Sequence, residues 1–423
     1  MLPRTSSFII VLLAMLTAVG PISTDMYLPA FPAMKLDLQS RPGEAQLTLA
    51  AWFLGLSIGQ LVHGPLSDHF GRRKPLLFGT ALYTIASIGC AASTSMTMLS
   101  VWRMIAAAGG AASLVIPRAV IRDLVKDGLQ AARLLGRLTL VVGVVPILAP
   151  TLGGAIAQDW GWRGIFWIAA LYGITCTLLI WRFLPDTLAP ESHVTLRLVP
   201  SLVRYNKVWR DRVFRTHALE GGFGTFSLFA FLGGAPAVFL GGFHLSPTSF
   251  GAVFILNAIG YIIGTQLNAR ILPRFGTTRV LSGSAIGLIA TTAAMLLVAL
   301  SPLRSPLGIT LCMMSCMTAL GFMLPGAAIG SLLPHSGEAG SASALYGTTV
   351  FFIGAISTVI IGIIGTTSPV PMAALMLAGA LAAGWYDYCR PRRSRSAPAQ
   401  KGKHRRKPMK SWNTPVRDKR RRS

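Results

Sequence analysis

Residues 64–77 read Gly-Pro-Leu-Ser-Asp-His-Phe-Gly-Arg-Arg-Lys-Pro-Leu-Leu, and they connect two long apolar segments, roughly 45–66 and 76–93. Each flanking segment is long enough to cross a bilayer, which takes about 20 residues at about 1.5 Å per residue. The connection is short and rich in turn-forming residues, so it predicts a tight hairpin between two spanning helices. Its three consecutive cations, at 72–74, predict that this hairpin lies on the cytoplasmic side.

The composition extends this expectation to most of the chain. Of its 423 residues, 52% are hydrophobic and only 13% are charged, whereas soluble domains have about 25% charged residues. Twelve apolar segments follow one another, at roughly 8–29, 45–66, 76–93, 97–120, 137–157, 163–183, 216–240, 249–268, 279–300, 306–332, 340–364 and 369–389. We therefore expect an all-α polytopic membrane protein with twelve transmembrane helices.

The position of the basic residues explains the formal net charge of +25. With both termini in the cytoplasm, 33 of the 39 Lys and Arg residues fall on the inside and four on the outside. Without the C-terminal tail the ratio is still 18 to four, so the orientation does not depend on the tail. Most of the charge thus reflects membrane topology, and it does not by itself indicate nucleic-acid binding.

The segments divide into two halves and a tail. We expect a six-helix bundle at 1–184, a basic cytoplasmic linker at 185–215, a second six-helix bundle at 216–389 and a disordered basic tail at 390–423. A faint repeat supports the division, because Phe-Gly-Arg-Arg-Lys between segments 2 and 3 corresponds to Phe-Gly-Thr-Thr-Arg between segments 8 and 9. Duplicated halves around a midplane site are typical of transporters. The tail is expected to contact anionic lipid.

Charges within the apolar segments are costly and therefore mark candidate functional sites. Asp25 lies near the outer end of segment 1 and Arg103 near the outer end of segment 4, so their depths match and each is the expected counter-ion of the other. Two interpretations are open: a carboxylate whose protonation is linked to substrate binding, or a static ion pair between the two helices. Three roles are open for Glu220, in segment 7: a second proton site, a site for cationic substrates, or an interfacial partner of Arg215.

Two further sets of residues are candidates for function. At the cytoplasmic surface, Asp68, Arg72, Arg122 and Asp123 bring opposite charges to the ends of segments 2, 3 and 4, where they can form a conformational latch. Within the membrane, aromatic and polar side chains suit a promiscuous substrate cavity. The candidates for that cavity are Tyr27, Gln60, Phe229, Phe231, Asn257 and Glu220. His63, close to the loop, is expected to have a structural hydrogen-bonding role.

Several motifs resemble those of the major facilitator superfamily. The loop matches the superfamily pattern Gly-x-Leu-Ala-Asp-Arg-x-Gly-Arg-Lys at Gly64, Leu66, Asp68, Gly71 and Arg72, with His69 where the family usually has Arg. In that superfamily the loop serves as a conformational latch whose acid also faces the N-terminal end of helix 11. Residues 149–154, Ala-Pro-Thr-Leu-Gly-Gly, resemble the Gly-Pro-x-x-Gly-Gly signature of drug:proton antiporters. Segment 5, which contains this motif, has small and helix-bending residues that include Pro146, Pro150, Gly153 and Gly154.

The N-terminal half resembles a narrower group, the bicyclomycin-resistance (Bcr/CflA) branch of twelve-helix drug:proton antiporters. The resemblance rests on residues 23–29, 59–60, 118–124 and 161–163, although Ala106 stands where the family's segment 4 pattern has Gln. It implies export of drugs or other small molecules from the bacterial cytoplasm in exchange for protons, across the inner membrane. Because the sequence gives no sign of oligomerisation, we expect a monomer, and we expect no cofactor.

Three other classes of function compete with this interpretation. A proton-coupled importer or uniporter of a small metabolite uses the same fold. An enzyme has little support, because Gly-Leu-Ser-Ile-Gly at 55–59 lies inside segment 2 and not on a strand-to-helix turn, and neither a Walker A motif nor His-Glu-x-x-His is present. A membrane scaffold that binds partners through its tail does not explain Asp25.

Overall fold

The computed structural model describes residues 7–125, 128–188, 198–302 and 304–391. Within these ranges the regular structure is helical. The helices are α1 (Ser7–Asp25), η1 (Leu28–Ala30), α2 (Phe31–Asp37), α3 (Glu44–Phe70), α4 (Arg73–Ala91), α5 (Met96–Leu124), α6 (Gly128–Phe183), α7 (Leu198–Arg210), α8 (Arg212–Ala235), η3 (Pro236–Gly242), α9 (Pro247–Phe275), α10 (Thr277–Leu300), α11 (Pro306–Leu332), η4 (Leu333–Glu338), α12 (Ala339–Ile364) and α13 (Pro369–Tyr388).

The expected helical membrane fold is confirmed. Ten helices in the described part of the chain are long and apolar enough to cross a membrane. Helix α6 is broken at Gly161, whose φ of 72° lies in the left-handed region that favours glycine. Helix α6 therefore supplies the fifth and sixth predicted segments, and α4 supplies the third. With α1, α3, α5 and α8–α13, this gives the twelve spans.

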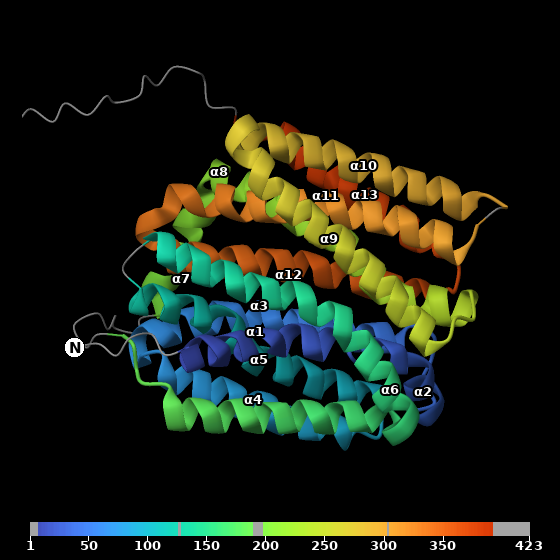
Figure 1. The fold of residues 1–423 in the computed structure, drawn as a ribbon, viewed down its shortest axis with the longest axis horizontal. Coiled ribbons are helices and arrows are strands. Elements are labelled where there is room, and N and C mark those ends of the chain that lie inside the picture. Colours follow the sequence, from blue (N-terminus) through green and yellow to red (C-terminus); the bar gives the residue numbers. More distant parts are fainter. Residues whose placement is uncertain (1–6, 126–127, 189–197, 303, 392–423) are drawn as a thin grey trace, which may run out of the picture. The chain divides into compact units, whose positions relative to one another are not determined.

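The two halves of the sequence form two groups of helices, which Figure 1 shows in blue to green and in yellow-green to red. In the first group, α5 packs on α3 and α4, and α6 packs on α4 and α1. In the second, α8 packs on α12 and α13, and α11 packs on α9 and α10. The groups meet where α3 lies along α12 and where α6 lies along α9. Residues up to Arg390 form one compact unit. Movement of the halves as separate bundles remains a prediction.

Helix α7, in the predicted linker, contacts α3 of one group and the start of α12 of the other. Its Tyr205 hydroxyl donates to the carbonyl oxygen of Leu61 in α3 at 3.1 Å, and its Lys207 pairs with Glu338, just before α12, at 2.9 Å. The hydrogen bond from Lys207 lowers the pKa of Glu338. Beyond Pro391 the predicted tail lies outside the described residues, as does 189–197 of the linker.

Candidate functional site

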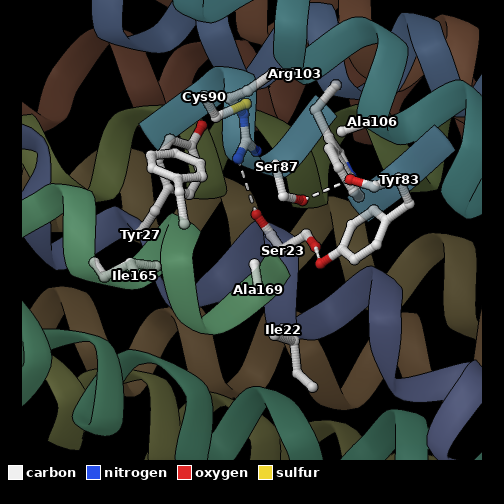
Figure 2. Close-up of a pocket in the computed structure, with 12 residues that line it drawn as sticks. Ile22, Ser23, Tyr27, Tyr83, Ser87, Cys90, Arg103, Ala106, Ile165 and Ala169 are labelled. Atoms are coloured by element: carbon white, nitrogen blue, oxygen red, sulfur yellow. Dashed lines mark hydrogen bonds between the residues drawn. The ribbon is translucent and has the colours of Figure 1, made fainter. Parts of the chain in front are cut away.

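Arg103, on α5, lies inside the N-terminal group with only 1% of its surface exposed. Its Nε donates to the carbonyl oxygen of Thr48 at 3.2 Å, and its Nη1 donates to the carbonyl oxygen of Ser23 at 3.1 Å. The guanidinium carbon lies 3.7 Å from the centre of the Tyr27 ring and 5.0 Å from that of Trp52. Backbone carbonyls and aromatic faces therefore hold this cation (Figure 2).

The predicted ion pair between Asp25 and Arg103 is not formed. Asp25 is the last residue of α1, is 6% exposed, and has no ion pair with any described residue. The position of Ser23 explains why Asp25 and Arg103 do not meet. The Ser23 hydroxyl lies 2.6 Å from the Tyr83 hydroxyl, so the Ser23 side of α1 faces the interior of the N-terminal group. A residue two positions further along a helix faces a different side. The depths of Asp25 and Arg103 match, but their directions do not.

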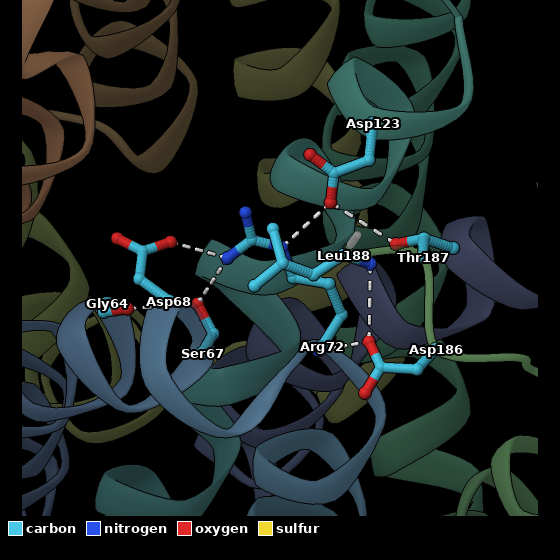
Figure 3. A network of polar contacts seen from close by, with 8 residues as sticks. All are labelled: Gly64, Ser67, Asp68, Arg72, Asp123, Asp186, Thr187 and Leu188. Atoms are coloured by element: carbon cyan, nitrogen blue, oxygen red, sulfur yellow. Dashed lines mark hydrogen bonds and ion pairs between the residues drawn. The ribbon is translucent and has the colours of Figure 1, made fainter. Parts of the chain in front are cut away.

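The loop between α3 and α4 forms a compact charge network around Arg72 (Figure 3). Its Nη1 lies 2.6 Å from Asp68 Oδ1 and 3.0 Å from the Ser67 hydroxyl, and its Nε lies 2.8 Å from Asp123 Oδ2. Burial alone lowers the pKa of Arg72, but hydrogen bonds to Asp123 and Asp68 outweigh burial and raise it. The guanidinium thus links the ends of α3 and α5 to the start of α4. Arg122, a predicted member, is exposed and forms no ion pair with the described residues.

Asp186, which follows α6, completes this network and was missed by the sequence analysis. Its Oδ1 accepts a hydrogen bond from the backbone N–H of Arg72 at 2.9 Å. Its carboxylate lies so close to Gly71 that a Cβ there would overlap it, and the φ of Gly71 is 82°. The neighbouring Thr187 donates to Asp123 Oδ2 at 3.2 Å. The available signal was an acid shortly after segment 6, at the end of the bundle where the loop at 64–77 was also expected.

Asp68 also reaches the other half of the protein. Its Oδ2 lies 3.7 Å from the position that a Cβ on Gly340 would occupy, in the first turn of α12. A carboxylate at a helix N-terminus is favoured by the helix dipole. The Asp68 carboxylate therefore lies near both Arg72 and the N-terminus of α12. Asp68 links the charge network to the C-terminal group of helices, as the loop motif implies.

The antiporter-like segment of α6 lies at the outer contact between the groups. A Cβ on Gly153 would overlap the carbonyl oxygen of Met26, the residue after Asp25, so only glycine permits this approach. A Cβ on Gly154 would lie 3.4 Å from Pro247, at the start of α9. Pro146 and Pro150 lie within the same helix. The segment thus packs against the end of α1 on one side and α9 on the other.

The predicted cavity residues occupy three different environments. Phe229 on α8 stacks on Phe53 of α3 with 3.6 Å between ring centres, and Gln60 of α3 fills the space beside Gly347 of α12. These contacts lie between the two halves. Tyr27 instead packs against Arg103 within the N-terminal group. In the C-terminal group, the rings of Phe231 and Phe254 are 5.6 Å apart, and the buried amide of Asn257 has no hydrogen-bond partner.

Glu220 pairs with Arg390 and not with Arg215. Glu220 has no exposed surface, and its Oε2 lies 3.7 Å from Nη1 of Arg390. Arg390 was assigned to the tail, yet it is 7% exposed and also bonds to Asp387 and, at 3.2 Å, to the hydroxyl of Ser282. Asp387 and Arg390 are only three residues apart at the end of the last span, so their pair is a local contact that the sequence could suggest. The contact with Glu220 has no such local signal.

The polar groups described above include no recognisable cofactor site. Within the described ranges, no group of three or more His, Cys, Asp or Glu side chains is placed to hold a metal ion. His63, buried in α3, has its Nε2 3.0 Å from the carbonyl oxygen of Ala108, in the structural role expected of it. The arrangement instead combines an isolated buried acid, a buried cation and a charged contact between helix ends.

Known proteins with similar sequences are transporters and resistance proteins. The chain is 34% identical over 377 residues to an uncharacterized MFS-type transporter, YdgK, of Bacillus subtilis, covering 88% of this chain and 92% of that protein. It is 30% identical over 375 residues to a chloramphenicol resistance protein of Pseudomonas aeruginosa, covering 87% and 88% of the two chains. A bicyclomycin resistance protein homolog of Haemophilus influenzae is 29% identical over 66% of this chain and 70% of its own.

Solved structures of transporters share the fold. A D-xylose-proton symporter superposes with a TM-score of 0.70 at 15% sequence identity, covering 90% of this chain and 97% of its own. A bacterial homolog of the human lysosomal transporter Spinster, inward-facing and occupied, also gives 0.70 at 15% identity, covering 91% and 96%. The family profile described as Major Facilitator Superfamily matches residues 13–242 and 221–421. The chain is a multi-pass membrane protein that belongs to the Major Facilitator Superfamily.

Proposed function

We propose that this protein is a proton-coupled antiporter that exports drugs or other small molecules by alternating access. The observation that carries the proposal is Asp25: a buried carboxylate at the end of a spanning helix, without an ion pair among the described residues. A carboxylate in such a place is free to gain and lose a proton. The names of the relatives, which include chloramphenicol and bicyclomycin resistance, support antibiotics as substrates.

The proposed cycle uses the contacts at both ends of the molecule. Inward-facing protein binds a substrate from the cytoplasm or inner leaflet while Asp25 loses its proton. The halves then rock about α3 and α12, and periplasmic protons displace the substrate. Gly153 beside Met26 lies next to Asp25, which supports a link between protonation and the outer contact. Asp68, between Arg72 and α12, serves as the inner latch, which stabilises one state without binding substrate.

The substrate is proposed to bind where the two halves meet. Phe53, Phe229 and Phe351 gather there from α3, α8 and α12, with ring centres 3.6–6.2 Å apart. Aromatic faces accept many lipophilic molecules, and Gln60 adds a polar group whose Nε2 has no partner. The excess of inner cations supports the bacterial inner membrane, with both termini cytoplasmic, as the location of the protein.

Inverted membrane vesicles test the proposal. Energised vesicles that contain the wild-type protein should accumulate chloramphenicol, and Asp25→Asn should abolish accumulation while the protein remains folded. Asp159→Asn is the matched control, because it makes the same change at an exposed acid. Unchanged accumulation by Asp25→Asn would contradict the proposal.

A further inference from the structure

The environment of Arg103 leaves its positive charge without a counter-ion. No carboxylate of the described residues pairs with it, and its hydrogen bonds go to two neutral carbonyl groups. Its third nitrogen, Nη2, is buried and has no hydrogen-bond partner. A buried cation without a partner is destabilising, and contact with the faces of Tyr27 and Trp52 offsets only part of that cost.

A small cavity lies directly beside this guanidinium. Its volume is about 10 Å³, and its lining includes Arg103, Trp52, Tyr27, Tyr83 and Ser87. Figure 2 shows the Arg103 guanidinium with Tyr27 on one side and Ser87 on the other, Ser23 below it and Tyr83 beyond Ser87. A space of this size holds about one water-sized particle. Asp25 is not part of the lining.

Two hydrogen-bond donors at the cavity have no partner among the described residues. Besides Arg103 Nη2, the indole Nε1 of Trp52 is buried and has no partner. The hydroxyls are already engaged, since Ser87 donates to the Tyr83 carbonyl and Tyr83 bonds to Ser23. A water molecule can accept from both free donors and donate to lone pairs of the Ser87 and Tyr83 hydroxyls, but it brings no charge to offset that of Arg103. An anion accepts from both and also supplies the missing negative charge.

We propose that this cavity binds a monatomic anion of the halide class, with chloride as the physiological ligand, held by Arg103 Nη2 and Trp52 Nε1. The bound anion is the counter-ion of Arg103. Asp25 already faces another side of α1, so with the anion bound it is not needed as a counter-ion and can exchange a proton. The binding itself does not depend on drug export, and the test below needs no substrate.

The experiment measures thermal unfolding of the full-length protein in detergent at constant ionic strength, while sodium gluconate is replaced by sodium chloride or bromide. The expected result is a saturable rise in the unfolding temperature with either halide. Trp52→Phe keeps the aromatic ring and removes the donor, so it should raise the half-saturating chloride concentration about tenfold. Trp160→Phe, at an exposed position, is the control and should leave it unchanged.

Two results would overturn the proposal. One is equal stability of the wild type in chloride and gluconate, which would mean that the cavity holds water or nothing. The other is a chloride response that is the same in Trp52→Phe as in the wild type, which would place the anion elsewhere. A crystal soaked in bromide gives a direct check: an anomalous peak within hydrogen-bonding distance of Arg103 Nη2 is expected, and its absence would contradict the assignment.

Discussion

The buried contact between Glu220 and Arg390 predicts a large loss of stability on removal of the cation. Glu220 has no exposed surface and neither of its oxygens has a hydrogen bond, so Arg390, 3.7 Å away, is its only source of compensation among the described residues. Removal of one partner of a buried ion pair costs about 3–5 kcal/mol when the remaining group stays charged, and less when that group takes up a proton. At a pH where Glu220 is ionised, Arg390→Met should therefore lower the free energy of unfolding by about 3–5 kcal/mol.

A double-mutant cycle separates this charge effect from simple loss of packing. Glu220→Gln removes the buried charge, so Arg390→Met in that background should cost about 1–3 kcal/mol less than it does in the wild type. Arg274→Met, at an exposed position on α9, is the control and should change stability by about 0.5 kcal/mol or less. The assay is denaturant unfolding of the purified protein in detergent. Equal effects of Arg390→Met with and without Glu220→Gln would refute the reasoning.

Three further predictions follow from contacts at the two ends of the protein. Asp68→Asn should slow transport several-fold with little change in drug binding, because it weakens the proposed latch. Transport by Asp68→Asn at the wild-type rate would count against such a latch. Gly153→Val should abolish transport by forcing α6 away from α1, whereas Gly283→Val, which has open space around it, should transport normally in the same vesicle assay. The lowered pKa of Glu338 means that its contact with Lys207 stabilises α7 above about pH 4.5 and is lost as the pH falls through the lowered value. Hydrogen exchange of α7, corrected for intrinsic rates, should then rise about two- to fivefold.

Local features of the fold could be predicted from the sequence because they depend on short-range spacing. Hydropathy located the spans. The orientation of the first hairpin, inferred from the cations at 72–74, stays a prediction. Asp68 and Arg72 are four residues apart and meet in the structure. The break in α6 at Gly161 also lies between two predicted segments.

Contacts between distant segments could not be predicted in the same way. Matching depth suggested that Asp25 pairs with Arg103, but depth gives no information on the direction in which each side chain points around its helix. Arg390 follows the last span and precedes a highly basic tail, so composition assigned it to the tail although it reaches Glu220, 170 residues earlier. Asp186 meets Arg72 only because α6 returns to the same end of the bundle as α3.

The most direct test of proton-coupled export is drug-induced proton release from the purified protein in weakly buffered detergent solution. A panel of lipophilic antibiotics, with chloramphenicol first, should cause release from the wild type and from Asp159→Asn. Asp25→Asn should bind the same drug and release no protons. Proton release of wild-type size from Asp25→Asn would contradict the assignment of Asp25 as the coupling site, and drug binding without release by the wild type would contradict antiport.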